Sequence, residues 1–221
     1  MNKNKVAVFG CGQRAKEIKY LLETEKNIIT DFFVVDKQYI NFEYIEGCRV
    51  IDTESFLNDF SPSQTKVYLG VGMPKMNRVR ERLFKQFNER GFHFEQFISE
   101  NATVYAEEIG EGTTVFAGVN IGPHVRIGKG NHFEMGVTVS HDCKIGDFNF
   151  FAPGAALCGD IKIGKGSFIG ANSTLRNSIT IGDYVLVGAG AYVDRSIASE
   201  KVIVPSRSMI LDNKTSEDFM K

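Results

Sequence analysis

Large apolar residues recur at every sixth position through the second half of the chain, without insertion or deletion. The fifteen positions are Ile109, Val115, Ile121, Ile127, Phe133, Val139, Ile145, Phe151, Leu157, Ile163, Ile169, Leu175, Ile181, Val187 and Val193. An amphipathic helix repeats near 3.6 residues and a strand at 2, so neither explains a strict period of six. A six-residue period is typical of a β-helix, in which each repeat forms one short strand and one corner. We therefore expect the apolar residues to point inward and to stack from coil to coil.

Glycine often follows the apolar residue of the repeat. These glycines are Gly110, Gly122, Gly128, Gly146, Gly164, Gly170, Gly182 and Gly188. We expect them to give the corners a backbone freedom that a Cβ atom would restrict.

The first hundred residues have a different pattern, in which short apolar runs alternate with helical spacing. Expected strands are Lys5–Phe9, Ile28–Val35, Cys48–Ile51 and Lys66–Val71, and expected helices are Ala15–Thr24, Thr53–Asp59 (with Thr53 as N-cap) and Asn77–Arg90. This alternation predicts a small parallel sheet with helices on its faces, which is a Rossmann-like arrangement. The chain is thus predicted to be an α/β domain over residues 1–101, followed by an all-β domain with a C-terminal tail over residues 102–221.

Composition narrows the possible functions. The formal net charge is −1 and the basic residues form no block, which disfavours binding to nucleic acid or to an anionic membrane. No apolar run approaches the ~20 residues of a spanning helix, and no signal peptide is expected. The four cysteines lack CxxC spacing, which fits a reducing compartment and predicts a cytoplasmic protein.

The turn after the first expected strand carries a candidate phosphate site, Gly10-Cys11-Gly12-Gln13-Arg14-Ala15. Backbone N–H groups at the start of a helix can cradle a phosphate, and the dinucleotide fingerprint tolerates alanine at its third glycine. Arg14 is a candidate for contact with a diphosphate. Asp36 ends the second strand, where a dinucleotide enzyme binds a ribose, and Gly72 and Arg78 form a further loop facing the same crevice. For each charged residue the alternative is a solvated loop position.

The segment Ser140-His141-Asp142-Cys143-Lys144-Ile145-Gly146-Asp147 resembles the signature "HDCxIGD" of the bacterial sugar acetyltransferases typified by PglD and NeuD. The order of an α/β domain before a hexapeptide block is similar to that family over the whole chain. The resemblance implies a left-handed β-helix, a homotrimer, acetyl-CoA bound between neighbouring subunits, and an N-domain that binds a nucleotide-linked sugar.

By this resemblance His141 is the general base and Asp142 the acidic residue that raises its basicity. The chemistry fits, because an amine that attacks a thioester must lose a proton and histidine titrates near neutral pH. Their adjacency alone does not show that the two side chains meet, because neighbours in a strand point to opposite faces. The family's oxyanion donor, a backbone N–H one coil beyond the histidine, corresponds to Gly159; a plain corner glycine is the alternative.

The resemblance also implies that Ala171 and Ala189 contact the coenzyme, mostly through backbone groups. The family often has a second histidine in "HIAPGA", but this chain has Phe150 there, which can pack on the pantetheine arm and cannot donate a hydrogen bond. Arg207 is either a contact for CoA phosphates or a solvated arginine.

The sequence therefore predicts an acetyl-CoA-dependent N-acetyltransferase for a nucleotide-linked amino sugar of the 4-amino-4,6-dideoxy or 3-amino type. Its product would enter O-antigen, lipopolysaccharide, capsule or protein-glycan assembly. The alternatives are O-acetylation of a sialic-acid-type sugar and a non-catalytic β-helix scaffold. Serine or succinyl transfer is disfavoured, because those enzymes usually carry a helical N-domain.

No metal is expected in this protein. The related γ-type carbonic anhydrases bind zinc through two histidines five residues apart. His124, His132 and His141 do not have that spacing, and His93 is expected to be a surface or packing residue.

Overall fold

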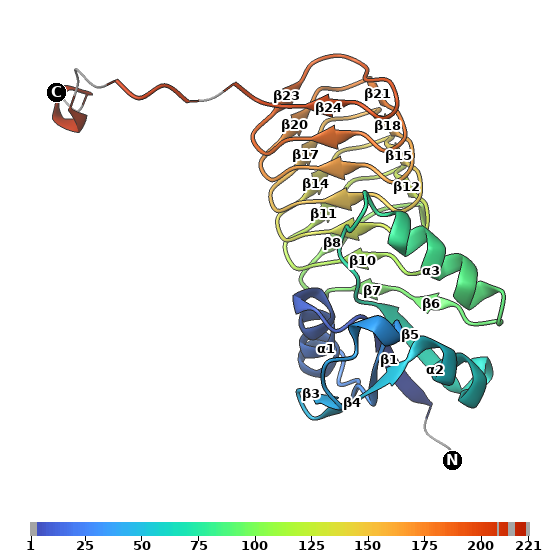
Figure 1. The fold of residues 1–221 in the computed structure, drawn as a ribbon. Coiled ribbons are helices and arrows are strands. Elements are labelled where there is room, and N and C mark those ends of the chain that lie inside the picture. The colour runs from blue at the N-terminus through green and yellow to red at the C-terminus, as the bar shows by residue number, and fades with distance from the viewer. Residues whose placement is uncertain (1–3, 207, 212–214, 220–221) are drawn as a thin grey trace.

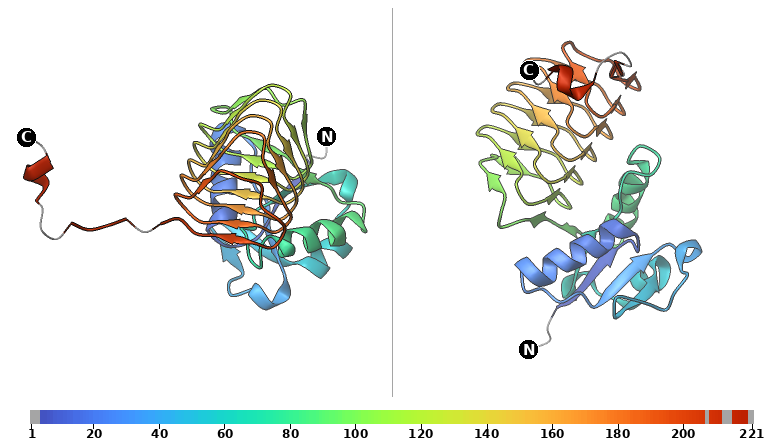
Figure 2. Two further views of the ribbon diagram at one scale, coloured as in Figure 1. Left: turned by 90° about the horizontal axis from the view of Figure 1, so that it is seen from above. Right: turned by 90° about the vertical axis from the view of Figure 1, so that its left-hand side faces the viewer.

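The computed structural model describes residues 4–206, 208–211 and 215–219, which form an α/β domain joined to a stack of triangular coils (Figures 1 and 2). The sheet of the first domain has the order β3-β4-β2-β1-β5-β6, and all neighbours are parallel except β3 and β4. Its strands are β1 (Lys5–Phe9), β2 (Phe32–Val35), β3 (Tyr44–Ile45), β4 (Cys48–Asp52), β5 (Thr65–Leu69) and β6 (Phe94–Glu95). The helices are α1 (Gln13–Glu25), α2 (Thr53–Asp59) and α3 (Arg78–Asn88), with 3-10 turns η1 (Lys37–Tyr39), η2 (Pro62–Gln64) and, near the C-terminus, η3 (Ser216–Phe219).

Two local predictions in this domain were wrong. Thr53 is not the N-cap of α2: the side chain of Asp52 accepts a hydrogen bond from the Ser55 N–H at 3.0 Å, and Thr53 is already helical. The second strand begins at Phe32 and not at Ile28, because the Ile28 N–H bonds the Leu22 carbonyl and closes the end of α1.

The second domain is a β-helix with three flat faces. Face 1 contains β7 (Phe97–Ile98), β10 (Thr114–Val115), β13 (His132–Phe133), β16 (Phe150–Phe151), β19 (Phe168–Ile169), β22 (Leu186–Val187) and β24 (Val202–Ile203). Face 2 contains β8 (Thr103–Val104), β11 (Asn120–Ile121), β14 (Thr138–Val139), β17 (Ala156–Leu157), β20 (Thr174–Leu175) and β23 (Tyr192–Val193). Face 3 contains β9 (Glu108–Ile109), β12 (Arg126–Ile127), β15 (Lys144–Ile145), β18 (Lys162–Ile163) and β21 (Thr180–Ile181).

The hexapeptide register is confirmed, since each predicted apolar position is the second residue of a two-residue strand. These residues form one continuous core along the axis of the coils. Phe133 and Phe151 show the stacking directly, with ring centroids 4.5 Å apart and planes 4° from parallel. The stacked strands begin with β7 at Phe97, a few residues before the expected domain start at 102.

The explanation expected for the corner glycines was wrong. A Cβ added to Gly110 would lie 2.5 Å from the carbonyl carbon of Gly128, so the glycine is needed because successive coils approach closely. The left-handed backbone comes two residues later, where φ is positive at residues of several types. Among them are Gly112, His124, Asp142, Asp160 and Asn172.

Helix α3 docks the first domain against the corner between faces 3 and 1 (Figure 1). The ring of Phe84 meets that of Phe148 at 5.1 Å, and both are buried. The Asn77 amide nitrogen donates to the carbonyls of Gly166 and Ser167, each at 3.2 Å. These contacts fix the two domains to each other. Of the helices that the structure describes, none has the length and apolar character required to cross a membrane.

Candidate active site

His141 and Asp142 lie at the corner between faces 2 and 3, directly after β14. Asp142 has a φ of 60°, and this left-handed turn brings its Oδ2 to 2.7 Å from Nδ1 of His141. The turn is fixed by a hydrogen bond from the Asp142 N–H to the Pro123 carbonyl at 3.1 Å. Both side chains are more than half exposed. A carboxylate that accepts from Nδ1–H leaves Nε2 as the proton acceptor, which is the form a general base needs.

Gly159 lies one coil further along the β-helix than His141, and the ring of His141 packs against it. A Cβ at this position would be 2.6 Å from Cε1 and 2.7 Å from Nε2 of His141. Among the described residues the Gly159 N–H has no acceptor, whereas the next N–H, that of Asp160, donates to the His141 carbonyl at 2.9 Å. A small residue with a free N–H beside the imidazole is suited to stabilise an oxyanion.

The first domain contains a cavity of about 830 Å³ at the carboxyl ends of β1, β2 and β5. The order of the sheet places the topological switch point between β1 and β5, where α/β sheets bind ligands. Five of the residues predicted for substrate binding line this cavity: Gly12, Gln13, Arg14, Asp36 and Gly72. Gly10 does not line the cavity; it lies against the backbone of Gly70, where a Cβ would meet the Gly70 carbonyl oxygen at 2.6 Å.

The cavity is also lined by residues that the sequence analysis did not single out. Tyr39 supplies an exposed aromatic ring and Lys75 a cation. Arg82 forms an ion pair with Asp36 at 2.6 Å, and Asp36 also accepts from the Thr53 hydroxyl at 2.9 Å. Lys75 could have been predicted from the sequence, because it lies in the same loop as Gly72.

The structure places Arg78 outside the cavity wall. Its guanidinium lies 3.8 Å from the ring centroid of Tyr184 and pairs with Glu200 at 3.5 Å. Arg78 therefore contacts the β-helix and does not join the other predicted substrate residues.

Phe150 is buried on face 1 in a column of aromatic rings. Its ring stacks on His132 at 4.8 Å and on Phe168 at 5.7 Å, and the guanidinium carbon of Arg14 lies 5.8 Å from its centroid. The Phe150 side chain thus contacts residues of both the β-helix and the first domain.

Ala171 and Ala189 stack on each other at the corner between faces 1 and 2, where the Gly190 N–H donates to the Ala171 carbonyl at 2.8 Å. His141 and Gly159 lie at a different corner, between faces 2 and 3. One copy of the chain therefore does not bring the predicted coenzyme residues and the predicted catalytic residues to the same edge of the prism.

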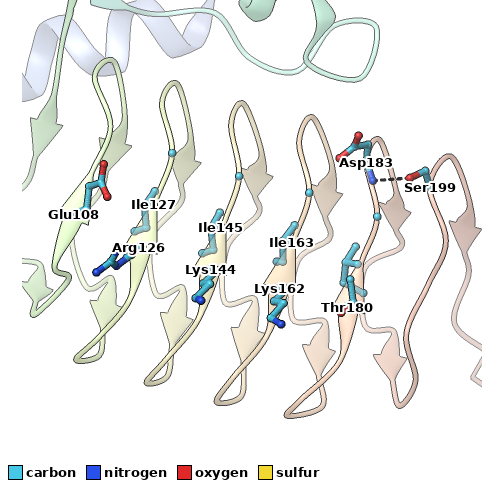
Figure 3. A pocket seen from close by; sticks show the side chains of 15 residues that line it. Glu108, Arg126, Ile127, Lys144, Ile145, Lys162, Ile163, Thr180, Asp183 and Ser199 are labelled. Carbon is cyan, nitrogen blue, oxygen red and sulfur yellow. Dashed lines mark hydrogen bonds between the residues drawn. The ribbon is translucent and has the colours of Figure 1, made fainter.

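A shallow groove of about 640 Å³ runs along face 3 (Figure 3). The outward side chains Arg126, Lys144 and Lys162 form a row of cations along it, and the carboxylate of Glu108 occupies the equivalent position in the strand before Arg126. Such a row favours an anionic ligand, but none of the predicted coenzyme residues lines this groove.

Within residues 4–206, 208–211 and 215–219, no group of three or more metal-ligating side chains is present. His124 pairs instead with Glu107 at 2.8 Å, and this carboxylate raises the pKa of the imidazole. Arg207 lies outside the described residues.

Three solved proteins resemble this chain over nearly its whole length. The acetyltransferase domain of PglB from Neisseria gonorrhoeae, solved in complex with acetyl coenzyme A, is 30% identical with a TM-score of 0.80, over 90% of this chain and 95% of that one. WeeI from Acinetobacter baumannii is 25% identical with a TM-score of 0.80, over 94% and 99% of the two chains. PerB from Caulobacter crescentus, solved with CoA and GDP-perosamine, is 26% identical with a TM-score of 0.80, over 92% and 96%.

The family model described as "Bacterial transferase hexapeptide (six repeats)" matches residues 142–177 and 160–195. No curated protein sequence matches the chain. Together with the stacked coils, the α/β domain and the His141–Asp142 corner, these similarities identify the chain as a member of the PglD/NeuD-like family of sugar acetyltransferases.

Proposed function

We propose that this protein transfers the acetyl group of acetyl-CoA to the amine of a nucleotide-linked amino-dideoxy sugar, of the 4-amino-4,6-dideoxy or 3-amino type. The observation that carries the proposal is the His141–Asp142 pair, whose Nδ1 and Oδ2 atoms are 2.7 Å apart, next to Gly159 with its free N–H. The cavity of about 830 Å³ at the switch point supports a nucleotide-sized substrate. The ligands of the similar proteins, acetyl coenzyme A for PglB and CoA with GDP-perosamine for PerB, support the same class of reaction.

The proposed reaction is a direct attack of the sugar amine on the thioester carbonyl. Nε2 of His141 takes a proton from the attacking nitrogen as the N–C bond forms, and Asp142 stabilises the resulting imidazolium. The Gly159 N–H donates to the carbonyl oxygen as it gains negative charge. The C–S bond then breaks and the thiolate of CoA leaves, to be protonated by the imidazolium. No acyl-enzyme is required, because the thioester is already activated.

A second copy of the chain is needed to complete this site. His141 and Gly159 occupy one edge of the prism, while Ala171, Ala189 and Phe150 lie at or beside another, so two neighbouring subunits would supply the two halves. We propose a homotrimer with acetyl-CoA between adjacent β-helices. Phe150 would pack on the pantetheine arm, and the residues lining the cavity of the first domain would hold the nucleotide and its diphosphate.

The further biological setting is also a proposal. An acetylated amino sugar linked to a nucleotide is a donor for surface glycans, so we place the protein in the cytoplasm, in O-antigen, lipopolysaccharide or related glycan synthesis. The scattered cysteines, which are free thiols in the structure, are consistent with a reducing compartment.

The test is a substrate panel with release of the CoA thiol as the readout. UDP-, dTDP- and GDP-linked amino sugars are compared with free sialic acids, and the product is analysed for N- or O-acetylation. We expect turnover with a nucleotide amino sugar and an amide product. Turnover with sialic acids alone would favour the O-acetyltransferase alternative, and failure to bind acetyl-CoA in calorimetry would favour the scaffold.

A further inference from the structure

Four polar side chains meet where the first domain docks on face 1: Arg14, Arg80, His132 and Glu134. Arg80, His132 and Glu134 are only 1%, 2% and 6% exposed. Buried ionisable groups are costly unless they are paired, so this cluster must have a compensating arrangement. None of the three fully buried members belongs to the catalytic pair described above.

Arg14 links this cluster to the nucleotide cavity. It lies in the first turn of α1 and lines the cavity, yet one of its terminal nitrogens pairs with the carboxylate of Glu134, at the corner between faces 1 and 2. The other terminal nitrogen pairs with Glu17 of the same helix at 2.5 Å. The guanidinium carbon also lies 5.2 Å from the ring centroid of Phe116. A wall residue of one domain is therefore held by a carboxylate of the other.

The charges of the cluster make Glu134 the critical member. Burial lowers the pKa of His132 to about 4, so this imidazole is neutral at neutral pH. Burial and the nearby charge of Arg14 lower the pKa of Arg80 to about 9, so Arg80 remains a cation. Glu134 is then the carboxylate that pairs with Arg14; burial would raise its pKa, but His132 and Arg14 hold it below the usual value. Arg14 and Arg80 already repel each other, and loss of the Glu134 charge would leave Arg14 without its partner on the β-helix.

His132 also contacts Glu134 through its tightly packed ring. Its ring is held between Phe116, at 5.0 Å edge to face, and Phe150, at 4.8 Å in a stack. Its Nε2 lies 3.4 Å from the Glu134 carboxylate, but the contact lacks the geometry of a hydrogen bond. The Glu134 carboxylate thus lies between the His132 ring and the Arg14 guanidinium.

We propose that Glu134 is a positioning residue for the nucleotide-sugar site. From the β-helix it fixes Arg14 in the cavity wall, so that Arg14 meets the diphosphate of the ligand only when the two domains are docked. The inference rests on the proposed function for the identity of the ligand. It extends that function, because the affinity for the nucleotide sugar would then depend on Glu134, a residue of the β-helix.

The main test compares Glu134→Gln with the wild type in titrations with UDP, dTDP and GDP, and with the corresponding nucleosides as controls. Glu134→Gln keeps the size of the side chain and removes its charge. We expect about a tenfold loss of affinity for the diphosphate that binds the wild type and no change for the nucleoside. In turnover assays the KM for the nucleotide sugar should rise by the same factor. The KM for acetyl-CoA should change less than twofold, and kcat less than threefold.

Two further variants separate positioning from folding. Arg14→Met with Glu134→Met removes both charges together, which avoids an unpaired buried arginine and should restore the melting temperature toward that of the wild type. If Glu134 acts through Arg14, this double variant, Arg14→Met alone and Glu134→Gln should all lose diphosphate affinity to the same extent. Phe84→Leu trims a packing contact at the domain boundary but leaves the Arg14–Glu134 pair and the docked arrangement in place, so it should leave diphosphate affinity unchanged.

Three results would overturn the inference: unchanged affinity in Glu134→Gln, additive losses for the Arg14 and Glu134 substitutions, or an equal loss in Phe84→Leu. A wild type that binds none of the diphosphates would overturn it as well. The proposed function is tested separately, since it fails if the wild type binds a nucleoside diphosphate but acetylates no nucleotide sugar. If the wild type acetylates a nucleotide sugar but Glu134→Gln leaves diphosphate affinity unchanged, the proposed function stands and only the inference about Glu134 fails.

Discussion

The β-helix and the first domain place their functional residues in different ways. In the β-helix one six-residue unit is repeated in strict register, so that residues eighteen apart, such as His141 and Gly159, lie one coil above the other. In the first domain the cavity is formed by loops after three strands, and its charged wall residues depend on pairs such as Asp36 with Arg82. We expect substitutions in the β-helix site to alter the chemical step, and substitutions in the cavity to alter binding.

The largest effect is expected for His141→Ala. Loss of the general base should lower kcat by at least ~100-fold while the protein still folds and assembles, because His141 is exposed and contributes nothing to the core. The measurement is initial-rate kinetics with saturating substrates, with assembly checked by light scattering. The control is His124→Asn at the preceding coil, where asparagine tolerates the left-handed φ of 59°. Near-normal turnover of His141→Ala would remove this residue from the mechanism.

His132, at the boundary between the two domains, is expected to make the protein sensitive to acid. The pKa of His132 is lowered from 6.5 to about 4 by burial, so the unfolded chain takes up this proton at a higher pH than the folded protein does. Stability should therefore fall as the pH drops from about 6.5 to about 4, by up to about 3 kcal/mol.

Urea unfolding at several pH values measures this slope. His132→Phe, which keeps a ring between Phe116 and Phe150, should flatten the slope, whereas His93→Gln on the surface should leave it unchanged. An unaltered slope in His132→Phe would show that other groups cause the acid sensitivity.

Gly159→Ala is expected to give the next largest loss, about 30-fold in kcat. The backbone at Gly159 is not left-handed and tolerates alanine, but the new Cβ would fall 2.6 Å from Cε1 of His141 and displace the imidazole. We estimate the loss from the cost of misplacing a catalytic group by about 1 Å. Asn177→Ala, at the equivalent exposed position one coil further, is the matched control. Equal rates for Gly159→Ala and the wild type would show that the imidazole does not work where the structure places it.

The sequence was sufficient to predict the repeating β-helix, but it was not sufficient to predict the contacts between the two domains. The period of six predicted the register of the stacked apolar residues, and the family resemblance, aligned on the motif at His141, implied Gly159. Whether Asp142 meets His141 could not be read from their adjacency, since it depends on the left-handed turn at Asp142.

The positions of the corner glycines were predicted correctly, but the reason given for them was wrong. The close approach of Gly110 to the next coil is a tertiary contact, so backbone freedom was the wrong explanation for it. Arg14 and Glu134 are 120 positions apart and meet only because α1 packs on the β-helix. The same docking takes Arg78 to Tyr184 and away from the cavity. Such contacts follow from the arrangement of the two domains, which no local pattern encodes.

Asp142→Asn should lower kcat by about tenfold, less than the loss of the base itself. Asparagine keeps the left-handed turn and the size of the side chain, but it removes the negative charge that stabilises the imidazolium at 2.7 Å. The measurement is kcat at saturating substrates, with the KM values for both substrates recorded. Asp160→Asn, the corresponding left-handed residue one coil further, should retain wild-type kcat. A rate equal to that of the wild type in Asp142→Asn would show that the carboxylate only shapes the corner.

The smallest effect, about threefold, is expected for Asp36→Asn in the cavity of the first domain, and it should appear in KM and not in kcat. Asp36 accepts from Thr53 and pairs with Arg82, so its loss loosens one wall of the cavity without reaching the acetyl group. A partly exposed ion pair contributes on the order of 1 kcal/mol or less, which corresponds to a change of this size. The control is Arg78→Gln, which lies outside the cavity and should leave both parameters unchanged. If Asp36→Asn lowered kcat instead, the cavity would take part in the chemical step, and the division of labour between the two domains would be wrong.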